Sequence, residues 1–236
     1  MDRFNRAFII MRKELKAYFI SPIAYIVIAL FVIFTGFFFF KDFFYFNQAE
    51  MRNFFQLLPL MFTFVVPAVT MRLFSEERQS GSLEILMTLP VTSLDVVAGK
   101  FLAGTVFTAV MIAPTLLYVI TLLIVGSPDP GPIIGGYIGA ILLGGAYTSI
   151  GVLASSLSRN QVIGFITAWA ACFSLWLVDK IVFFMPSFLG FLEYLGSDTH
   201  FQNISKGVID TRDIIYFVSI MALCMLATVK TLDERR

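Results

Sequence analysis

The charged side chains whose spacing is most distinctive lie in one stretch between positions 72 and 91. This stretch carries three carboxylates, at Glu76, Glu77 and Glu84, but no histidine or cysteine accompanies them. An activated nucleophile or a transition-metal site needs partners of that kind. Catalysis by this stretch is therefore not expected, and its charges favour recognition of another protein.

A short, rigid helix is predicted inside the same stretch. Gly81 interrupts the chain, and Ser82 is a residue type that caps helices, with Glu84 close to the positive end of the helix dipole. Pro90 ends the helix. Apolar residues repeat at the spacing of one helical face, at Leu83, Leu86 and Met87. The product is a helix held between two breaks, which presents carboxylates and an apolar edge to a partner.

The rest of the chain has little that could do chemistry. Cys172 and Cys224 fall inside apolar runs, where a free cysteine behaves as a small core residue. His200 is the only histidine and is expected at the surface. The sequence has no G-x-x-x-x-G-K-[ST] phosphate loop. We therefore expect no cofactor and no enzyme activity, and any nucleotide hydrolysis must take place on another chain.

The composition predicts an all-α membrane protein. Hydrophobic residues make up 58% of the 236 positions and charged residues 14%, whereas about a quarter of a soluble domain is charged. A membrane-spanning helix needs about 20 mainly apolar residues. Six stretches qualify as transmembrane helices, at Pro22–Phe40, Leu57–Met71, Phe101–Val125, Ile133–Leu157, Val162–Val178 and Ile214–Val229. The net charge of +1 gives no reason to expect a nucleic-acid partner.

Within these boundaries no span contains Asp, Glu, Lys, Arg or His. Carriers that are driven by an ion gradient usually hold an ionisable group at membrane depth, because something must bind and release the ion. Without such a group, energy is expected to enter from a cytoplasmic loop.

Proline and glycine within the spans predict local shape. Pro67 and Pro114 should kink the second and third spans. Gly131, Gly135 and Gly139 recur every four residues into the fourth span, a spacing that lets helices approach closely. This pattern is first a prediction of packing, and dimerisation is an alternative use of it.

The distribution of Lys and Arg predicts the orientation. Twelve of the 17 basic residues lie on the side that includes both termini and the 72–100 loop, and five lie on the other side. Basic residues concentrate in cytoplasmic loops. Both termini and the 72–100 loop are therefore expected in the cytoplasm.

Two amphipathic segments flank the spans. Residues 1–21 carry an apolar face of Phe4, Phe8, Met11, Leu15 and Tyr18, and Ser21-Pro22 ends that segment. We expect a basic amphipathic helix in the headgroup plane, with an ordinary positive anchor as the alternative. The 181–213 segment has an apolar face of Phe201, Ile204, Val208 and Ile209. It predicts one or two short external helices that rest on the outer membrane surface.

The pattern Glu76-Glu77-Arg78-x-x-Gly81-Ser82-Leu83-Glu84-x-Leu86-x-Thr88-x-Pro90-Val91 resembles the signature loop of ABC-2 type permeases. The resemblance extends along nearly the whole chain, so that residues 1–236 form a single ABC-2 type transmembrane domain. Arg12-Lys13-Glu14-Leu15 with Ser21-Pro22 is similar to the permeases associated with gliding motility and with nitrous-oxide-reductase maturation. The segment Gly207-Val208-Ile209-Asp210-x-Arg212-Asp213 is similar to theirs as well.

The resemblance implies the membrane subunit of an exporter in the bacterial cytoplasmic (inner) membrane. Such permeases pair as homodimers or heterodimers, and each subunit docks on a separate ABC ATPase subunit. The 1–21 segment would be the connecting helix and the 72–100 loop would hold the coupling helix. Residues expected to couple the permease to the ATPase are Glu76, Glu77, Gly81, Ser82, Leu83, Glu84, Leu86 and Pro90.

Two alternatives stay open at the level of sequence. In the first, the chain is a membrane assembly subunit that transports nothing and conveys the ATPase cycle to external partners through the 181–213 segment. In the second, it is a membrane-embedded enzyme that acts on lipid. The absence of clustered His, Asp and Glu in or near the spans disfavours the second.

Overall fold

The computed structural model describes residues 3–46, 50–88, 90–126, 128–182, 194–208 and 210–234. Every regular element in these ranges is a helix. Six helical segments there are long and apolar enough to cross a membrane, which confirms the predicted number of spans. Their elements are α2 (Pro22–Phe46), α3 (Arg52–Thr70) with α4 (Arg72–Gln79), α6 (Ser93–Ile112) with α7 (Leu116–Val125), α8 (Pro130–Leu157), α9 (Gln161–Val182) and α11 (Thr211–Asp233).

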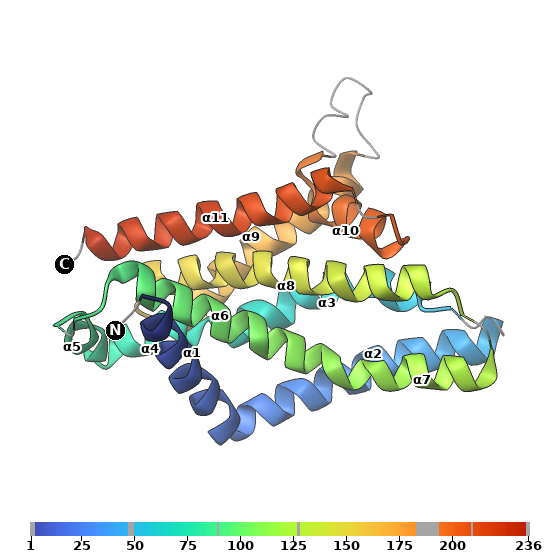
Figure 1. The fold of residues 1–236 in the computed structure, drawn as a ribbon, viewed down its shortest axis with the longest axis horizontal. Helices are drawn as coiled ribbons and strands as arrows, with labels where there is room; N and C mark the ends of the chain where they lie inside the picture. The colour runs from blue at the N-terminus through green and yellow to red at the C-terminus, as the bar shows by residue number, and fades with distance from the viewer. Residues whose placement is uncertain are drawn as a thin grey trace.

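The remaining α-helices are shorter or lie across the ends of the bundle. Figure 1 shows α1 (Arg3–Ile20), α4 and α5 (Ser82–Thr88) at the end of the bundle that also holds both chain termini. We call this the terminal end. The helix α10 (Ser197–Ser205) lies at the opposite end, which we call the far end. The 1–21 segment, the 72–100 loop and the described part of the 181–213 segment, which were distinguished in the sequence, thus form separate elements at the two ends.

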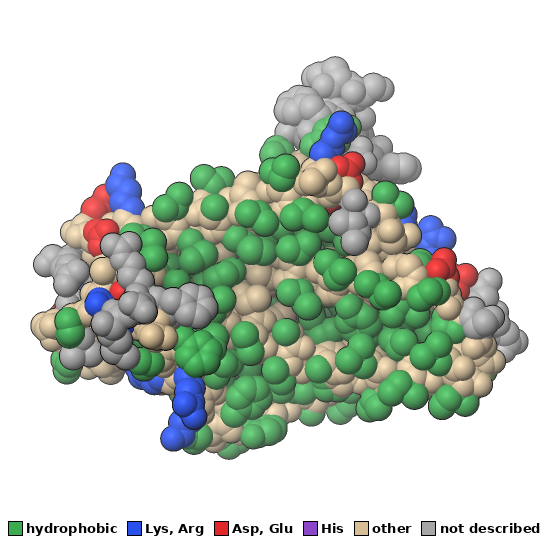
Figure 2. Space-filling view, in the orientation of Figure 1, with side chains coloured by type: hydrophobic (Ala, Val, Ile, Leu, Met, Phe, Trp, Pro, Cys, Tyr) green, Lys and Arg blue, Asp and Glu red, His purple; other side chains and the backbone are tan. Residues whose placement is uncertain are grey.

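The helix α8 lies at the centre of the bundle. It packs against α3, α6, α9, α10 and α11, and its buried residues are mostly small: glycine, alanine and serine account for most of them. Apolar side chains cover the middle of the face seen in Figure 2, and charged side chains gather toward its two ends. This distribution is the one that a bilayer requires, because charge is costly in its hydrocarbon core.

The prolines in the spans have different consequences. Pro67 lies inside α3, which the structure describes as one continuous helix that also contains Pro59. Pro114 lies in a short 3-10 helix, Ala113–Thr115, that separates α6 from α7. Proline lacks the N–H that an α-helix needs at an interior position. The predicted irregularity in the third span is therefore present as a change of helix type.

The glycine spacing at the start of α8 serves packing within the chain. A Cβ atom on Gly135 would lie 2.3 Å from the carbonyl oxygen of Ile204, and one on Gly139 would lie 3.2 Å from the ring of Phe201. Both neighbours belong to α10. The face of α8 that holds Gly135 and Gly139 is therefore occupied by α10, as expected for a pattern that serves packing.

The predicted position of the external segment is wrong in part. Phe201 and Ile204 are completely buried because α10 packs into the end of the bundle against α8, α3 and α9 instead of resting on an outer surface. Val208, on the predicted apolar face, is exposed. Residues 183–193 and Ile209 lie outside the described residues.

His200 was expected at the surface, and this prediction is wrong. Its ring is buried, its Nδ1 lies 2.6 Å from a carboxylate oxygen of Asp213, and its Nε2 lies 3.0 Å from the carbonyl oxygen of Tyr194. Its ring also stacks on that of Tyr216, with centroids 4.0 Å apart. The histidine therefore joins α10 to α11. Sequence could not foresee this, because the partners become neighbours only through the fold.

The N-terminal helix forms as predicted, but its buried face is shifted by part of a turn from the predicted one. α1 ends at Ile20 and α2 begins at Pro22, at the expected break. Ala7, Ile10 and Tyr18 are buried, whereas half of the Phe8 side chain is exposed. α1 packs against α6, and a Cβ atom on Gly99 of α6 would lie 2.7 Å from Ile10. The side chain of residue 4 lies outside the described part of the chain.

Candidate functional site

The charged stretch singled out in the sequence forms a helical hairpin at the terminal end. α4 directly follows α3, and Gly81 turns the chain with φ +72°, a conformation that residues with a Cβ atom rarely adopt. α5 then begins at Ser82. Two short helices with one glycine turn between them therefore project from the end of the second span (Figure 1). We call α4, the turn and α5 the hairpin.

Among its described side chains, the hairpin exposes charge and one large apolar residue. Glu84 in the first turn of α5 is exposed, and 69% of the surface of Ile85 is exposed. Leu83 and Leu86, which were predicted to form the apolar edge, instead pack partly against the core of the terminal end. The side chain of Met87 lies outside the described residues. The free edge of α5 is therefore the Glu84–Ile85 edge.

Two other residues of the predicted site have local roles. α5 begins at Ser82 itself, and the Ser82 hydroxyl lies 2.9 Å from that of Ser80 and 3.4 Å from the carbonyl oxygen of Glu77. The hydroxyl thus closes the turn. Pro90 follows α5 and is exposed, and its carbonyl oxygen accepts a hydrogen bond of 2.9 Å from Arg6 of α1. The segment after α5 is therefore anchored to α1.

The two carboxylates of α4 differ in their surroundings. Glu76 is exposed, whereas the side chain of Glu77 is 16% exposed. Lys100 of α6 lies 2.9 Å from Glu77 and 2.9 Å from Glu14 of α1, and Lys13 of α1 lies 3.3 Å from Glu77. Glu77 therefore holds α4 to α1 and α6, and it is not free to meet a partner. We call Lys13, Glu14, Glu77 and Lys100 the charge cluster.

Lys100 is the central cation of this cluster. Its side chain is fully buried, and its ammonium group also donates a 2.6 Å hydrogen bond to the carbonyl oxygen of Leu73 and lies 5.0 Å from the ring centroid of Phe74. A buried charge is tolerated when paired charges and hydrogen bonds replace its water. Two carboxylates, a carbonyl and an aromatic face do so here. α1, α4 and α6 are consequently joined through one side chain.

A second set of contacts joins the hairpin to α8. The Ser155 hydroxyl accepts hydrogen bonds from the N–H groups of Phe74 (2.9 Å) and Ser75 (3.0 Å) and donates one to the carbonyl oxygen of Met71 (2.8 Å). Arg78 donates a hydrogen bond to the carbonyl oxygen of Ser156. The first N–H groups of a helix have no partner within it. Ser155 supplies that partner, so that the start of α4 is fixed to α8.

Tyr18 connects α1 to the junction of α3 and α4. Its hydroxyl donates a 2.9 Å hydrogen bond to the carbonyl oxygen of Val69, and the Arg72 guanidinium lies 4.4 Å from its ring centroid. Burial raises the pKa of Tyr18 well above its ordinary value. Tyr18 therefore stays a neutral donor, and a guanidinium on its ring adds a cation–π contact.

The start of α6, the helix after the hairpin, is capped by two side chains. The hydroxyl of Thr92 accepts a hydrogen bond from the N–H of Asp95, and a carboxylate oxygen of Asp95 accepts one from the N–H of Thr92. This capping box starts α6 at Ser93. Arg6 of α1 lies 3.9 Å from the same carboxylate. The first turn of α6 is thus tied to α1 as well.

Sequence reasoning identified the hairpin but missed the residues that hold it. Lys100 stands immediately before the predicted third span, and Glu14 stands among basic residues of the N-terminal segment. Each looks like an ordinary boundary charge when taken alone. Ser155 falls inside an apolar span. The one sign in the sequence was the position of Lys100 directly beside a span, because a lysine at that depth needs a partner for its charge.

These features define the class of the protein. It is a multi-pass helical membrane protein with a polar hairpin at one end that is held by contacts with α1, α6 and α8. The chain belongs to the ABC-2 family of transporter proteins, since the model of that family matches residues 8–231. It is accordingly a membrane permease of an ABC transporter. Permeases of this family generally partner with an ABC ATPase and a second permease. None of the curated proteins compared with the chain matches it.

Proposed function

We propose that this permease is an export subunit that moves its substrate outward while a separate ABC ATPase subunit hydrolyses ATP. In this proposal the hairpin is the coupling element, and α1 is the connecting helix beside it. The terminal end faces the cytoplasm of a bacterium, and two permease chains pair in the inner membrane. The subfamily that we favour is the one associated with gliding motility and nitrous-oxide-reductase maturation, on the motifs described above.

The observation that carries the proposal is the contrast between the two sides of the hairpin. Its outer edge exposes Glu76, Glu84 and Ile85. Its inner side is fixed by buried contacts of Glu77 and by the hydrogen bonds of Ser155. A partner bound to the outer edge would therefore act on a hairpin that is fixed to the helix bundle rather than on a loose loop.

The electrostatics agree with this use. Glu84 lies in the first turn of α5, where its charge favours the helix dipole and needs no partner within the chain. Carboxylates beside one exposed apolar residue suit a surface that offers basic groups around an apolar pocket, because complementary charge aids docking and specificity. Residues proposed to meet the ATPase are Glu76, Ser82, Glu84 and Ile85; those proposed to hold the hairpin in place are Glu77, Gly81, Leu83, Leu86 and Pro90.

The test reverses the charge at the outer edge. We would tag the chain, purify it from its native membrane, and measure the ATPase subunit that co-purifies and its rate of ATP hydrolysis. Glu84→Lys should reduce the recovered ATPase at least about tenfold, since loss of a charge complement and gain of a like charge both oppose docking. The matched control is Glu234→Lys, the same charge change at an exposed position near the end of α11. Unchanged recovery and unchanged hydrolysis for Glu84→Lys would refute this docking edge.

A mechanical role without transport is the second candidate, and one observation favours it. α8 contacts α4 at one end and α10 at the other, so that movement of the hairpin has a direct route to the external surface. In a transport assay with reconstituted complex, a cross-link that narrows the path along the spans should stop an exporter. A mechanical subunit would keep its function under that cross-link and lose it when the external surface is altered.

A further inference from the structure

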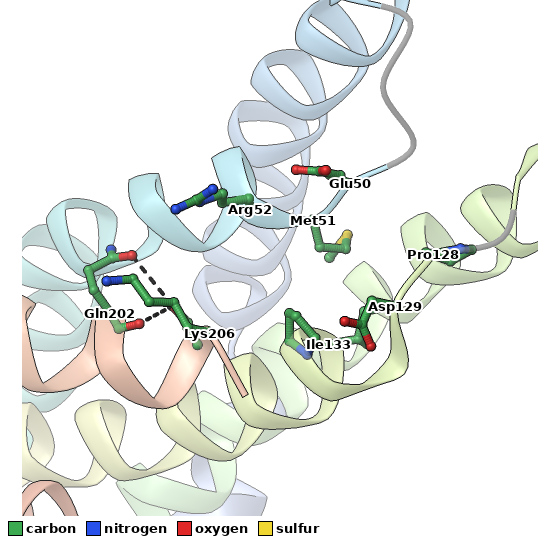
Figure 3. Close-up of a pocket in the computed structure, with 10 residues that line it drawn as sticks. Glu50, Met51, Arg52, Pro128, Asp129, Ile133, Gln202 and Lys206 are labelled. Carbon is green, nitrogen blue, oxygen red and sulfur yellow. Dashed lines mark hydrogen bonds between the residues drawn. The ribbon is translucent and has the colours of Figure 1, made fainter. Parts of the chain in front are cut away.

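A cavity at the far end of the bundle is not used by the proposed coupling mechanism. It has a volume of about 630 Å³ and lies where the turn before α3, the start of α8 and the end of α10 meet. Figure 3 shows that its lining comes from these three places in the chain. Such a volume is in the range of small-molecule sites.

The cavity carries a balanced set of charges. Arg52 and Lys206 are its basic residues, and Glu50 and Asp129 are its acidic ones. Among the described residues, none of the four takes part in an ion pair with another side chain. All four residues are exposed, so that their charges are open to a ligand that enters the cavity.

The four charges come from three walls of the cavity. In Figure 3 the side chains of Arg52 and Lys206 extend toward the side where Gln202 lies, Glu50 lies beside Arg52 at the turn before α3, and Asp129 lies on another wall beside Ile133. A cavity that binds an anion is expected to be lined by more cations than carboxylates. A cavity that binds a cation is expected to be lined by more carboxylates than cations. A balanced set of two basic and two acidic side chains complements a ligand that carries both charges.

Two walls of the cavity pack against each other. Met51 and Ser205 line the cavity and are buried, and the Ser205 hydroxyl donates a hydrogen bond to the carbonyl oxygen of Gln202. Gly207, with φ +87°, lies so close to Gly131 that a Cβ atom would be 3.0 Å from the Gly131 carbonyl carbon. The end of α10 and the start of α8 are therefore in backbone contact.

We propose that this cavity binds a zwitterionic headgroup that contains a phosphate and an ammonium group. The phosphate would lie at Arg52 and Lys206, since both donate charge-assisted hydrogen bonds to phosphate oxygens. The ammonium group would lie at Glu50 and Asp129. The apolar base of Met51, Pro132 and Ile133 accepts the first carbons beyond the headgroup. The headgroup can belong to a membrane lipid or to a free phosphoethanolamine compound, and the binding assay separates these sources.

The experiment uses the full-length permease, purified in detergent and stripped of lipid. Native mass spectrometry would count bound phosphatidylethanolamine and, in a parallel titration, bound phosphatidylglycerol of the same acyl chains. We expect phosphatidylethanolamine to bind about tenfold more tightly, because the anionic lipid lacks the ammonium group. Soluble glycerophosphoethanolamine is added as a competitor. Full competition identifies the free compound as a ligand, and lipid binding without competition identifies the lipid; both support the headgroup site.

The variants test the two halves of the site separately. Arg52→Gln with Lys206→Gln removes the phosphate contacts, and Glu50→Gln with Asp129→Asn removes the ammonium contacts. Asp129 accepts a hydrogen bond from Gly131 at the start of α8, and asparagine keeps that cap. Each pair should weaken phosphatidylethanolamine binding at least about fivefold.

Arg212→Gln is the matched control, because Arg212 is an exposed cation of the far end that does not line the cavity. Arg52→Lys with Lys206→Arg keeps the charge and should keep the binding, which separates loss of charge from loss of folding. Equal binding of the two lipids, no binding of either, or unchanged binding in both neutralised pairs would overturn the proposal. None of these results depends on the ATPase, so that they are independent of the coupling proposal.

Discussion

Replacing Lys100 with methionine should destabilise the terminal end of the bundle more than any other single charge removal there. The substitution keeps the length and apolar stem of the side chain and removes only the ammonium group. Glu14 and Glu77 would then face each other at side-chain exposures of 13% and 16%, without the cation that lies 2.9 Å from each. The carbonyl oxygen of Leu73 would lose its donor as well.

The magnitude follows from these contacts. Breaking a buried ion pair by removing one partner costs roughly 3–5 kcal/mol, since the remaining charge is uncompensated. Lys13 lies 3.3 Å from Glu77 and 3.8 Å from Glu14 and offsets part of that loss. We therefore expect a loss of about 3 kcal/mol, toward the lower end of the range. For a chain of this size that corresponds to a fall in Tm of about 6–12 °C.

The assay is thermal unfolding in detergent, followed by the fraction of monodisperse protein after heating. Lys16→Met is the control, because Lys16 is an exposed cation on α1. The triple variant Lys100→Met, Glu14→Gln, Glu77→Gln should recover at least half of the lost Tm, since no uncompensated charge then stays buried. A change in Tm below about 2 °C for Lys100→Met, or no recovery in the triple variant, would refute the reasoning.

Three further substitutions test single features of the fold. Gly135→Ala places a Cβ atom 2.3 Å from a carbonyl oxygen of α10. It should lower the free energy of unfolding by about 1–3 kcal/mol, which is measured as a fall in Tm. Gly131→Ala is the control and should change Tm little, because the nearest atom to its Cβ is 3.5 Å away. Thr92→Ala removes a cap of α6 and should lower stability by about 1 kcal/mol, whereas Thr92→Ser should preserve it. Gly81→Ala requires a residue with a Cβ atom to adopt φ +72°, which costs about 1 kcal/mol. A protease should therefore cleave the hairpin of the variant faster than that of the wild type. Equal cleavage rates for the two proteins would contradict this.

The elements of the fold could be predicted from sequence, but most contacts between them could not. Hydropathy is a property of about 20 consecutive residues, so that the number of spans could be predicted directly. The break at Ser21-Pro22 and the Gly81 turn could be predicted as well, because proline and glycine act on the backbone at their own positions. The capping box of Thr92 and Asp95 is equally local, because its two residues are three positions apart. In each case the cause and its effect lie within a few turns of one helix.

The errors share the opposite property. His200 is buried because Asp213 and Tyr216, on another helix, face it. The glycines of α8 predicted close packing, but nothing local indicates that α10 is the helix that covers Gly135 and Gly139. The predicted apolar face of α1 was off by part of a turn, since Gly99 leaves room for Ile10. Spacing shows that a helix has a face to bury, and the partner across that face depends on the tertiary fold.

The position of α8 explains how these distant contacts work together. Its 28 residues span about 42 Å at 1.5 Å per residue. Ser155 near one end holds the first turn of the hairpin, and Gly135 near the other end is in backbone contact with α10. Helices that are packed through small residues and backbone atoms resist sliding, because a shift produces overlaps that no side-chain rotation relieves. If a partner acts on the hairpin as proposed, we therefore expect a displacement of α4 to move α8 as a nearly rigid body and to reach α10.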